Sequence, residues 1–179
     1  MIPVKILRNI TDRSPTDGED LWWQVSRMLP EGNLQILDLG SGQFRWEKEG
    51  YKITYVDIKL YPDVIQHDCN LDLPFKNDEF DGLVSIELIE HIENPYHLLR
   101  ECTRILKKCN SSMIFTTPFY RNSEALDTWL GDKRAYLNFG HRIIVPDWFF
   151  YCYGRELGWD VQFSVSRPRG HCLIVRLIR

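Results

Sequence analysis

The chain has 179 residues, of which 44% are hydrophobic and 26% are charged, and its formal net charge is −3. These values are ordinary for a globular protein, and we expect a single domain over residues 1–179. The slightly acidic charge gives no electrostatic footprint for nucleic acid or for an anionic membrane, so a nucleic-acid partner is not expected. No segment approaches the roughly 20 apolar residues of a membrane span. Residues 1–13 lack the apolar core of a signal peptide, and the five cysteines form no CxxC pair. These features favour a reduced, cytoplasmic protein.

Helix-like and strand-like segments follow one another along the chain. We expect residues 1–19 to form a flexible N-terminal arm because residues 11–19 are polar and turn-rich. Asp20 to Leu29 is typical of a short helix that Pro30 stops. Apolar runs rich in Val, Ile and Leu then predict strands buried on both faces. These runs lie at residues 34–39, 52–56, 64–67, 82–86 and 113–117.

The clearest helix lies between the last two of these runs. Asn94 suits its N-cap position and Pro95 its first turn. Lys107 and Lys108 suit the negative end of the helix dipole, and Asn110 can end the helix.

The C-terminal part adds a helix over residues 147–157 and two strands, at 159–165 and 172–178. The turn between these strands suits an antiparallel hairpin. Strands that alternate with crossovers and end in a hairpin predict an α/β fold, a three-layer Rossmann-like sandwich around a mostly parallel sheet.

The most informative segment is LQILDLGSGQF, residues 34–44. A buried strand carries Asp38 near its end, and a Gly-Ser-Gly turn at residues 40–42 follows. Glycines accept unusual backbone angles and leave room for a ligand to approach the chain closely. The next strand ends in Asp57, where the ribose hydroxyls of a nucleoside would lie. The third glycine of the dinucleotide fingerprint is missing, because position 45 is Arg45.

Five motifs in order resemble the class I S-adenosylmethionine-dependent methyltransferases over Leu34 to about Gly158. They are D-L-G-S-G, Y-V-D, H-D-C-N, L-P-F-x-x-x-x-F-D and E-L-I-E-H. The likeness is greatest to small single-domain enzymes of the ubiquinone-pathway and glycan-modification type. It implies a seven-stranded sheet with strand order 3-2-1-4-5-7-6 and an antiparallel seventh strand. The first and fourth strands are then neighbours, so the glycine turn is expected to face the segment that begins at Glu87.

Two connections depart from the usual pattern of this family. The crossover at residues 42–52 leaves room for only a shortened first helix. The segment at residues 57–64 leaves almost no room for the second helix. We therefore expect the cofactor face to be more open than is usual in the family.

The resemblance implies S-adenosylmethionine as cofactor and gives several residues a role in binding it. Asp38 and the glycine turn would hold the methionine end, Asp57 the ribose hydroxyls and Asp68 the adenine amino group. Loop capping is the alternative for Asp38 and Asp57, and a short polar turn is the alternative for Asp68. The predicted cofactor-binding residues are Asp38, Gly40, Ser41, Gly42, Asp57, Ile58, Asp68, Cys69 and Ser85.

The segment from Glu87 to His91, E-L-I-E-H, provides the catalytic candidates. On a helical turn, Glu87 would share one face with Glu90 and His91. Two carboxylates and an imidazole can form a base held by an acid, or a divalent-metal site. Similar spacing binds magnesium in some ubiquinone-pathway O-methyltransferases. We predict that His91, Glu87 and Glu90 are catalytic, with His91 as general base. A magnesium site of the same three residues and a structural role near the helix terminus are the alternatives.

Residues 116–141 carry no strong periodicity, and a long irregular stretch in a compact domain is usually a lid or a binding loop. We expect Phe119, Tyr120 and His141 to contact the acceptor substrate, although an ordinary hydrogen-bonded histidine would explain His141 equally well. Three functions remain open: methylation of a small molecule or sugar, with oxygen as acceptor atom; methylation of a protein, glycan or RNA; and a methyltransferase-like domain without activity.

Overall fold

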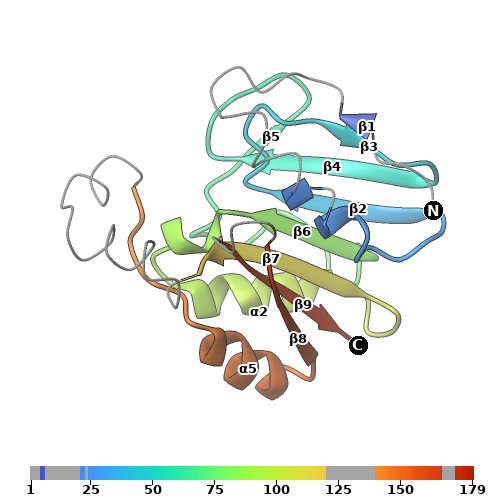
Figure 1. Ribbon diagram of the computed structural model, residues 1–179. Coiled ribbons are helices and arrows are strands. Elements are labelled where there is room, and N and C mark those ends of the chain that lie inside the picture. Colours follow the sequence, from blue (N-terminus) through green and yellow to red (C-terminus); the bar gives the residue numbers. More distant parts are fainter. Residues whose placement is uncertain (1–4, 7–20, 23, 120–139, 167–171) are drawn as a thin grey trace.

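The computed structural model describes residues 5–6, 21–22, 24–119, 140–166 and 172–179 (Figure 1). A seven-stranded sheet forms its centre, with the order β5-β4-β2-β6-β7-β9-β8. Its strands are β2 (Leu34–Leu39), β4 (Tyr51–Asp57), β5 (Ile65–Gln66), β6 (Gly82–Ile86), β7 (Ser112–Pro118), β8 (Asp160–Val165) and β9 (Cys172–Ile178). The first five pair in parallel, and β9 is antiparallel to both β7 and β8. Numbered along the chain, this is the order 3-2-1-4-5-7-6, so the predicted topology is confirmed.

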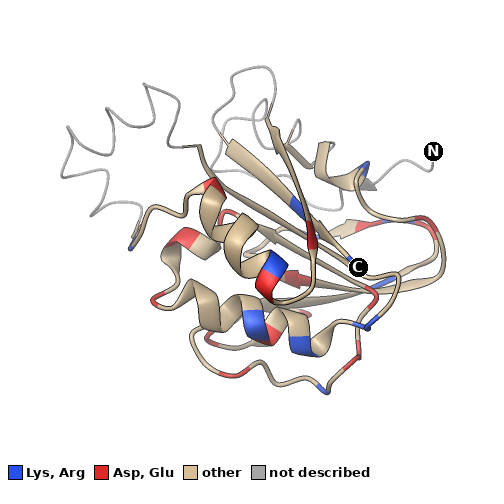
Figure 2. Cartoon of the chain, turned by 90° about the horizontal axis from the view of Figure 1, so that it is seen from below, with Lys and Arg blue, Asp and Glu red and all other residues tan. Residues whose placement is uncertain are grey.

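Alternating side chains along the strands divide the core between the two faces of the sheet. On one face, residues such as Leu37 and Leu83 pack against α2 (Pro95–Ile105) and α5 (Asp147–Glu156). These two helices lie side by side on that face (Figures 1 and 2). The alternate residues, such as Ile36, pack on the opposite face in a second cluster. The three layers of the predicted sandwich follow from this division.

The second face is covered by the segment that the sequence predicts as its first helix. Residues 21–22 and 24–26 are helical, and Leu21, Trp22 and Val25 are buried. Trp22 stacks on Phe44, with ring centroids 4.8 Å apart. The predicted helix is thus confirmed over residues 21–22 and 24–26, but it ends before Leu29, because residues 27 and 28 form a turn. Asp20 lies outside the described residues.

The predicted N-terminal arm contains a short strand, β1 (Lys5–Ile6), which pairs antiparallel with β3 (Trp46–Glu47). The other residues of the arm lie outside the described part of the chain. β3 occupies the crossover at which a shortened helix was expected, and that expectation is wrong. The side chain of Trp46 is only 1% exposed and belongs to the second core cluster, so a buried indole and a strand pair replace the helix.

The helix α2 begins as predicted but ends earlier than expected. Asn94 is its N-cap, and its side chain accepts a hydrogen bond from the backbone N–H of His97 at 3.1 Å. The helix stops at Ile105 rather than near Asn110. Leu106 instead forms a parallel bridge with Phe80, so the chain leaves the helix to extend the sheet pairing.

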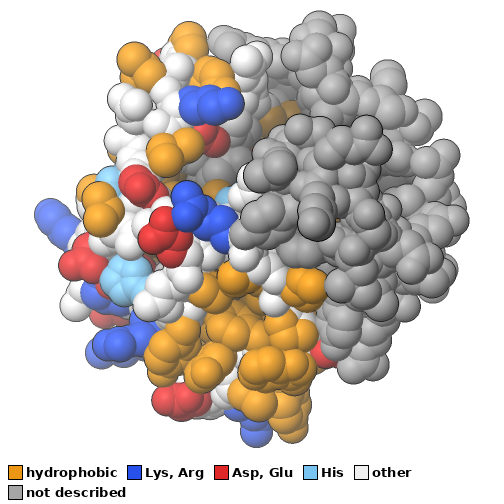
Figure 3. Space-filling view, turned by 90° about the vertical axis from the view of Figure 1, so that its left-hand side faces the viewer, with side chains coloured by type: hydrophobic (Ala, Val, Ile, Leu, Met, Phe, Trp, Pro, Cys, Tyr) orange, Lys and Arg blue, Asp and Glu red, His pale blue; other side chains and the backbone are white. Residues whose placement is uncertain are grey.

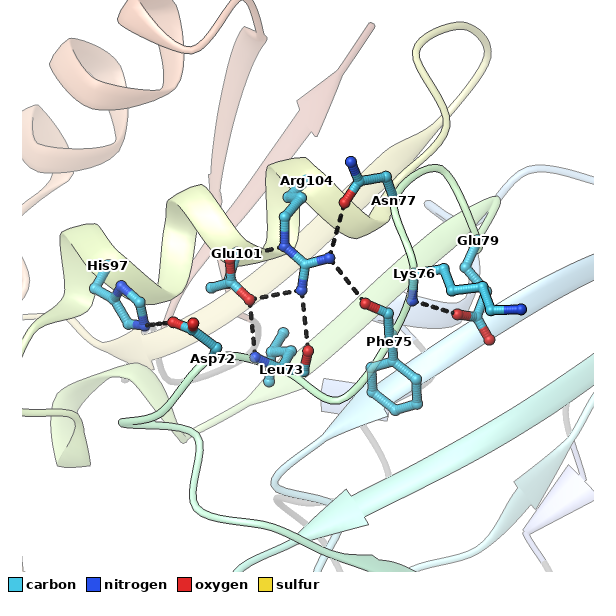
Figure 4. A network of polar contacts seen from close by, with 9 residues as sticks. All are labelled: Asp72, Leu73, Phe75, Lys76, Asn77, Glu79, His97, Glu101 and Arg104. Carbon is cyan, nitrogen blue, oxygen red and sulfur yellow. Dashed lines mark hydrogen bonds and ion pairs between the residues drawn. The ribbon is translucent and has the colours of Figure 1, made fainter.

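The connection from β5 to β6 is an irregular loop that side chains of α2 hold in place (Figure 4). The guanidinium of Arg104 donates to both carboxylate oxygens of Glu101, and to the carbonyls of Leu73 and Phe75 at 3.0 and 2.8 Å. Glu101 in turn accepts from the backbone N–H of Leu73 at 2.8 Å. The planar fork of arginine suits this pattern of a carboxylate and several carbonyls. The loop therefore has fixed anchor points although it contains no helix.

In the described ranges, no helix has the length and apolar character needed to cross a bilayer.

Candidate active site

The glycine turn lies at the carboxyl end of β2, beside the end of β4. The backbone N–H groups of Gly40 and Ser41 donate to the carbonyl of Val56, at 2.8 and 3.1 Å. Gly40 has a φ of +73°, in the left-handed region that favours glycine. A Cβ at Gly40 would lie 3.0 Å from the Cβ of Leu88, so the turn packs closely against the segment after β6. The predicted approach of the glycine turn to the Glu87 segment is confirmed.

Asp57 ends β4 and ties the turn to the loop that follows the strand. Its carboxylate accepts from the backbone N–H of Gly42 at 2.8 Å and from that of Lys59 at 2.9 Å. These two bonds are the loop-capping role that the sequence left open. Each carboxylate oxygen can accept more than one hydrogen bond, so the same side chain keeps capacity for ribose hydroxyls. Ile58 follows directly and is 59% exposed.

Asp38 is buried, with 1% of its surface exposed, and its Oδ2 accepts from the indole N–H of Trp46 at 2.8 Å. Burial raises the pKa of Asp38 to about 7, and the Trp46 hydrogen bond and the charge of Arg45 oppose this shift. A carboxyl group with this pKa is partly protonated at neutral pH. A nearby positive charge would favour its ionised form. We therefore expect a cationic ligand beside Asp38 to shift this carboxyl group toward its ionised form.

Asp68 and Cys69 follow β5, in the loop that α2 holds. Oδ1 of Asp68 accepts from the backbone N–H of Asn70 at 2.9 Å and from its side-chain amide at 2.8 Å, and these bonds lower the pKa of Asp68. Burial, together with the charges of Asp68 and Asp57, raises the pKa of the Cys69 thiol to about 12. β5 pairs in parallel with β4, with Gln66 opposite Asp57, so Asp68 follows at the same edge of the sheet as Asp57.

Two buried hydroxyl groups provide a test of whether the site fits a polar ligand. Ser41 is 7% exposed and Ser85 is fully buried, and neither Oγ has a hydrogen-bond partner among the described residues. A Cβ at Gly42 would meet no atom within 4 Å. Buried polar atoms normally have partners. Here Ser41 lies in the glycine turn, which has open space at Gly42, and Ser85 lies near the end of β6, the strand beside β2. These residues fit the polar methionine end of S-adenosylmethionine.

Glu87 directly follows β6, and its φ of +52° prevents the helical turn that would align it with Glu90 and His91. The short 3-10 helix η1 covers only Ile89–His91. The hydroxyl of Thr116 donates to Oε1 of Glu87 at 2.9 Å and accepts from its backbone N–H at 3.1 Å. The expected common face is therefore wrong, because Glu87 is anchored on β7. A catalytic role for Glu87 stays a prediction.

Glu90, His91 and His141 instead form a cluster. Oε1 of the buried Glu90 lies 4.0 Å from Nε2 of both histidines, whose ring centroids are 4.8 Å apart. His141 lies there because the backbone N–H groups of Arg142 and Ile143 donate to the carbonyl of Glu90, at 2.8 and 3.3 Å. The structure thus joins a predicted acceptor residue to two predicted catalytic residues.

A hydrogen bond determines the tautomer of neutral His91, and burial lowers the pKa of His141. Nδ1 of His91 lies 3.0 Å from the carbonyl oxygen of Gly140. A carbonyl can only accept, so Nδ1 carries the hydrogen and Nε2 of the neutral ring has a lone pair. Burial, and then the positive charge that His91 carries when it is protonated, lowers the pKa of His141, which is therefore neutral at neutral pH. The lone pair on Nε2 of neutral His91 can accept a proton, and the nearby Glu90 carboxylate can stabilise the imidazolium that results.

The predicted acceptor residues are only partly described. Phe119 follows β7 and packs against the main core cluster, whereas Tyr120 lies outside the described residues. Hydrophobic side chains gather on the lower part of the face drawn in Figure 3, where α5 lies. Trp148 and Tyr151 of α5 are 58% and 57% exposed.

Sequence reasoning missed three residues that shape the site: Trp46, Asn70 and Arg104. Asn70 stands in the quoted motif H-D-C-N, but nothing in that motif shows which backbone group its amide would meet. Trp46 falls where a helix was expected, and the role of Arg104 depends on a loop conformation without periodicity. The roles of Trp46 and Arg104, and the bond between Asn70 and Glu93, follow from tertiary contacts.

Comparisons with known proteins agree with this geometry. Residues 37–110, from the glycine turn to the end of the α2 region, match the family model described as "Methyltransferase domain". A search of curated proteins found no match.

Solved structures share the fold at low sequence identity. An S-adenosylmethionine-dependent methyltransferase from Archaeoglobus fulgidus has a TM-score of 0.70 and 14% identity, covering 90% of this chain and 93% of that chain. One from Mesorhizobium loti has a TM-score of 0.69 and 19% identity, covering 91% and 99%. A chain from the Haloferax volcanii complex with the Trm112 methyltransferase activator has a TM-score of 0.66 and 15% identity, covering 90% and 89%.

The family match spans the glycine turn, Asp57 and the E-L-I-E-H segment. Residues 37–110 thus match a methyltransferase domain, and the chain has the fold of solved S-adenosylmethionine-dependent methyltransferases.

Proposed function

We propose that this methyltransferase acts on an oxygen atom of a small molecule or sugar, with His91 as the general base. One observation carries the proposal: the cluster of Glu90, His91 and His141 follows directly the segment that packs on the glycine turn. A proton acceptor therefore lies next to the residues that fit the cofactor. Methyl transfer to a hydroxyl without a metal uses both a positioned cofactor and a group that takes up the hydroxyl proton.

The cofactor would be held by the ends of four neighbouring strands, β5, β4, β2 and β6. Ser41, Ser85 and the glycine turn would contact its methionine end, Asp57 its ribose and Asp68 its adenine. When bound, S-adenosylmethionine supplies a methyl group that its sulfonium activates. The chain must then position the acceptor in line with that methyl group and take up the proton that the acceptor loses.

His91 suits the second task. The carbonyl of Gly140 fixes its Nδ1–H, so Nε2 could take the hydroxyl proton as the methyl group passes from sulfur to the acceptor oxygen, leaving S-adenosylhomocysteine. The carboxylate of Glu90, 4.0 Å from Nε2, stabilises the imidazolium that results. The neutral His141 adds no competing positive charge.

The charge distribution supports a small acceptor over a nucleic acid. Both acidic and basic residues occur along the helices drawn in Figure 2, and the formal net charge of the chain is −3. A nucleic-acid surface would instead need clustered lysine and arginine. Methylation of a protein or glycan remains the alternative that the acceptor screen tests.

The first test is calorimetry with S-adenosylmethionine and S-adenosylhomocysteine, which we expect to bind with comparable affinity. The second is transfer of a labelled methyl group into separate metabolite, glycan and protein extracts. Label in a small hydroxyl compound supports the proposal. Label in protein alone overturns the acceptor class, and binding without any transfer overturns the proposed reaction.

The cluster also favours a second role for these residues, a divalent-metal site. Ligand atoms of Glu90, His91 and His141 all lie within 4.8 Å of one another, and the other nitrogen of His91 is bonded to a carbonyl, as is usual for metal-bound histidine. This donor set differs from the expected Glu87, Glu90 and His91. Two imidazoles and one carboxylate suit zinc better than magnesium, which prefers oxygen ligands.

Metal binding can be measured apart from activity. Titration of zinc and magnesium salts into the chelator-treated protein should show zinc binding that His141→Ala removes, if the metal role is correct. Full activity in chelator, together with no zinc binding, leaves His91 as a base and removes the metal. Activity that requires zinc would assign His91 as a ligand instead.

A further inference from the structure

Asn70 connects the loop after β5, which carries Asp68, to the segment that follows Glu90 and His91, and it makes three hydrogen bonds. Its backbone N–H and its side-chain amide both donate to Oδ1 of Asp68, at 2.9 and 2.8 Å. Its Oδ1 accepts from the backbone N–H of Glu93 at 2.8 Å. Glu93 lies two residues after His91, and its carboxylate pairs with Arg142 at 2.5 Å. The side chain of Asn70 therefore spans from the loop after β5 to the segment after η1.

We propose that Asn70 is a positioning residue for the cofactor's adenine: it holds Asp68 through one oxygen and leaves the other oxygen to accept the adenine amino group. The proposal rests on the proposed function, because it needs the adenine to lie at Asp68. It adds a residue that does not itself touch the cofactor but sets the geometry of one that does.

The hydrogen-bonding capacity of the amide explains why asparagine suits this position. Its NH2 group is a donor for Asp68, and its oxygen is an acceptor for Glu93. An aspartate here would keep the acceptor but would place a second carboxylate against Oδ1 of Asp68. An alanine would lose both side-chain bonds and keep only the backbone N–H. The two variants therefore separate the bond to Asp68 from the bond to Glu93.

A matched control exists in the same loop. Asn77 makes a single side-chain hydrogen bond among the described residues, accepting from Arg104 at 3.0 Å, and its partner is therefore not Asp68. Asn77→Ala thus reports on a lost loop anchor without a change at the adenine position.

The experiment measures binding of S-adenosylhomocysteine and of adenosine by calorimetry. We expect Asn70→Ala to weaken both ligands about tenfold, the effect of losing one hydrogen bond to a charged group. Asn70→Asp should weaken them more than Asn70→Ala, because the added carboxylate repels Asp68 and disfavours its ionised form. Asn77→Ala should leave both affinities within about twofold of the unmodified protein. In an Asp68→Ala background, Asn70→Ala should have no further effect.

A pH profile distinguishes this role from a purely structural one. The bonds from Asn70 lower the pKa of Asp68, and His67 and Arg142 are the charged groups whose fields act in the same direction. Without the side-chain amide, the loss of affinity on acidification should begin at higher pH. A structural role would lower the melting temperature and leave the shape of this profile unchanged.

The outcomes are separable. If the unmodified protein binds neither ligand, the proposed function fails and this inference fails with it. If the unmodified protein binds both ligands but Asn70→Ala matches Asn77→Ala, only the inference is overturned. The alanine variant decides the question if Asn70→Asp does not fold.

Discussion

The candidate site has two halves that are built in different ways. The cofactor half surrounds the glycine turn, Asp57 and Asp68, and the acceptor half surrounds Glu90, His91 and His141. In the cofactor half, the bonds of the glycine turn stay within a short stretch of chain, from Gly40 to Lys59. In the acceptor half, His91 meets Gly140 across 49 residues of sequence. Local backbone bonds at strand ends are encoded by local motifs. A cluster of side chains from distant segments depends on the whole fold, so it is the part where members of one family can differ most.

The halves also differ in how they accommodate unusual backbone conformations. The cofactor half uses Gly40 and Gly42 in the left-handed region, where glycine has no steric penalty. The acceptor half places Glu87 there, with a φ of +52°. A non-glycine residue in this region costs about 1–2 kcal/mol. The two hydrogen bonds of Thr116 offset that cost, and such strain is typical of functional sites.

The largest effect is expected at the centre of the acceptor half. His91→Ala should lower turnover by roughly 10²–10⁴-fold, the usual contribution of a positioned base, while cofactor affinity stays nearly unchanged. Steady-state rates and calorimetry measure the two quantities separately. His97→Ala is the matched control, because His97 has similar exposure and pairs with Asp72 at 3.3 Å, in the network of Figure 4. Full activity of His91→Ala on the true acceptor would leave proximity and cofactor activation as the whole mechanism.

The contact between the halves can be tested with a pair of glycines. Gly40→Ala should destabilise the protein by about 2–5 kcal/mol, from the positive φ and from the clash with Leu88. Gly42→Ala carries the positive φ but meets no atom within 4 Å, so about 1–2 kcal/mol is expected. Thermal and denaturant unfolding measure both changes. Equal losses would show that the Leu88 contact is unimportant.

Substitution of Asp57 tests whether its carboxylate binds the cofactor, holds the backbone of the glycine turn, or does both. Asp57→Ala should weaken S-adenosylhomocysteine by about 1.5–3 kcal/mol, the scale for hydrogen bonds to a charged group. Because Gly42 and Lys59 both donate to this carboxylate, the variant should also lose stability. Asp57→Asn keeps an acceptor oxygen and should lose less of each. Unchanged affinity in a folded Asp57→Ala would reduce Asp57 to a loop cap.

The contrast between the halves also explains what the sequence could predict. The glycine turn and the N-cap at Asn94 follow from short patterns, the strand order follows from the family resemblance, and all three were predicted correctly. Glu87 could not be placed, because a periodicity argument assumes a helix that its backbone does not form. The partnership of His141 with Glu90 needed the fold, since nothing local joins residues so far apart. The shortened helix expected at residues 42–52 was wrong, because Trp46 is buried there by packing against Trp22, a contact that local sequence does not show.

The smallest effect concerns protonation in the cofactor half. Burial raises the pKa of Asp38 from 3.8 to about 7, so this group favours the folded state below pH 3.8. That contribution is lost as the pH rises toward 7. A cofactor with a positive charge favours the ionised form, so its binding should release a proton below pH 7, and affinity should rise by at most about tenfold per pH unit up to that value. Calorimetry in two buffers with different ionisation enthalpies measures the released proton. Asp38→Asn should abolish the release, whereas release that persists in this variant would assign it to Asp57 or Asp68, the other carboxylates of this half.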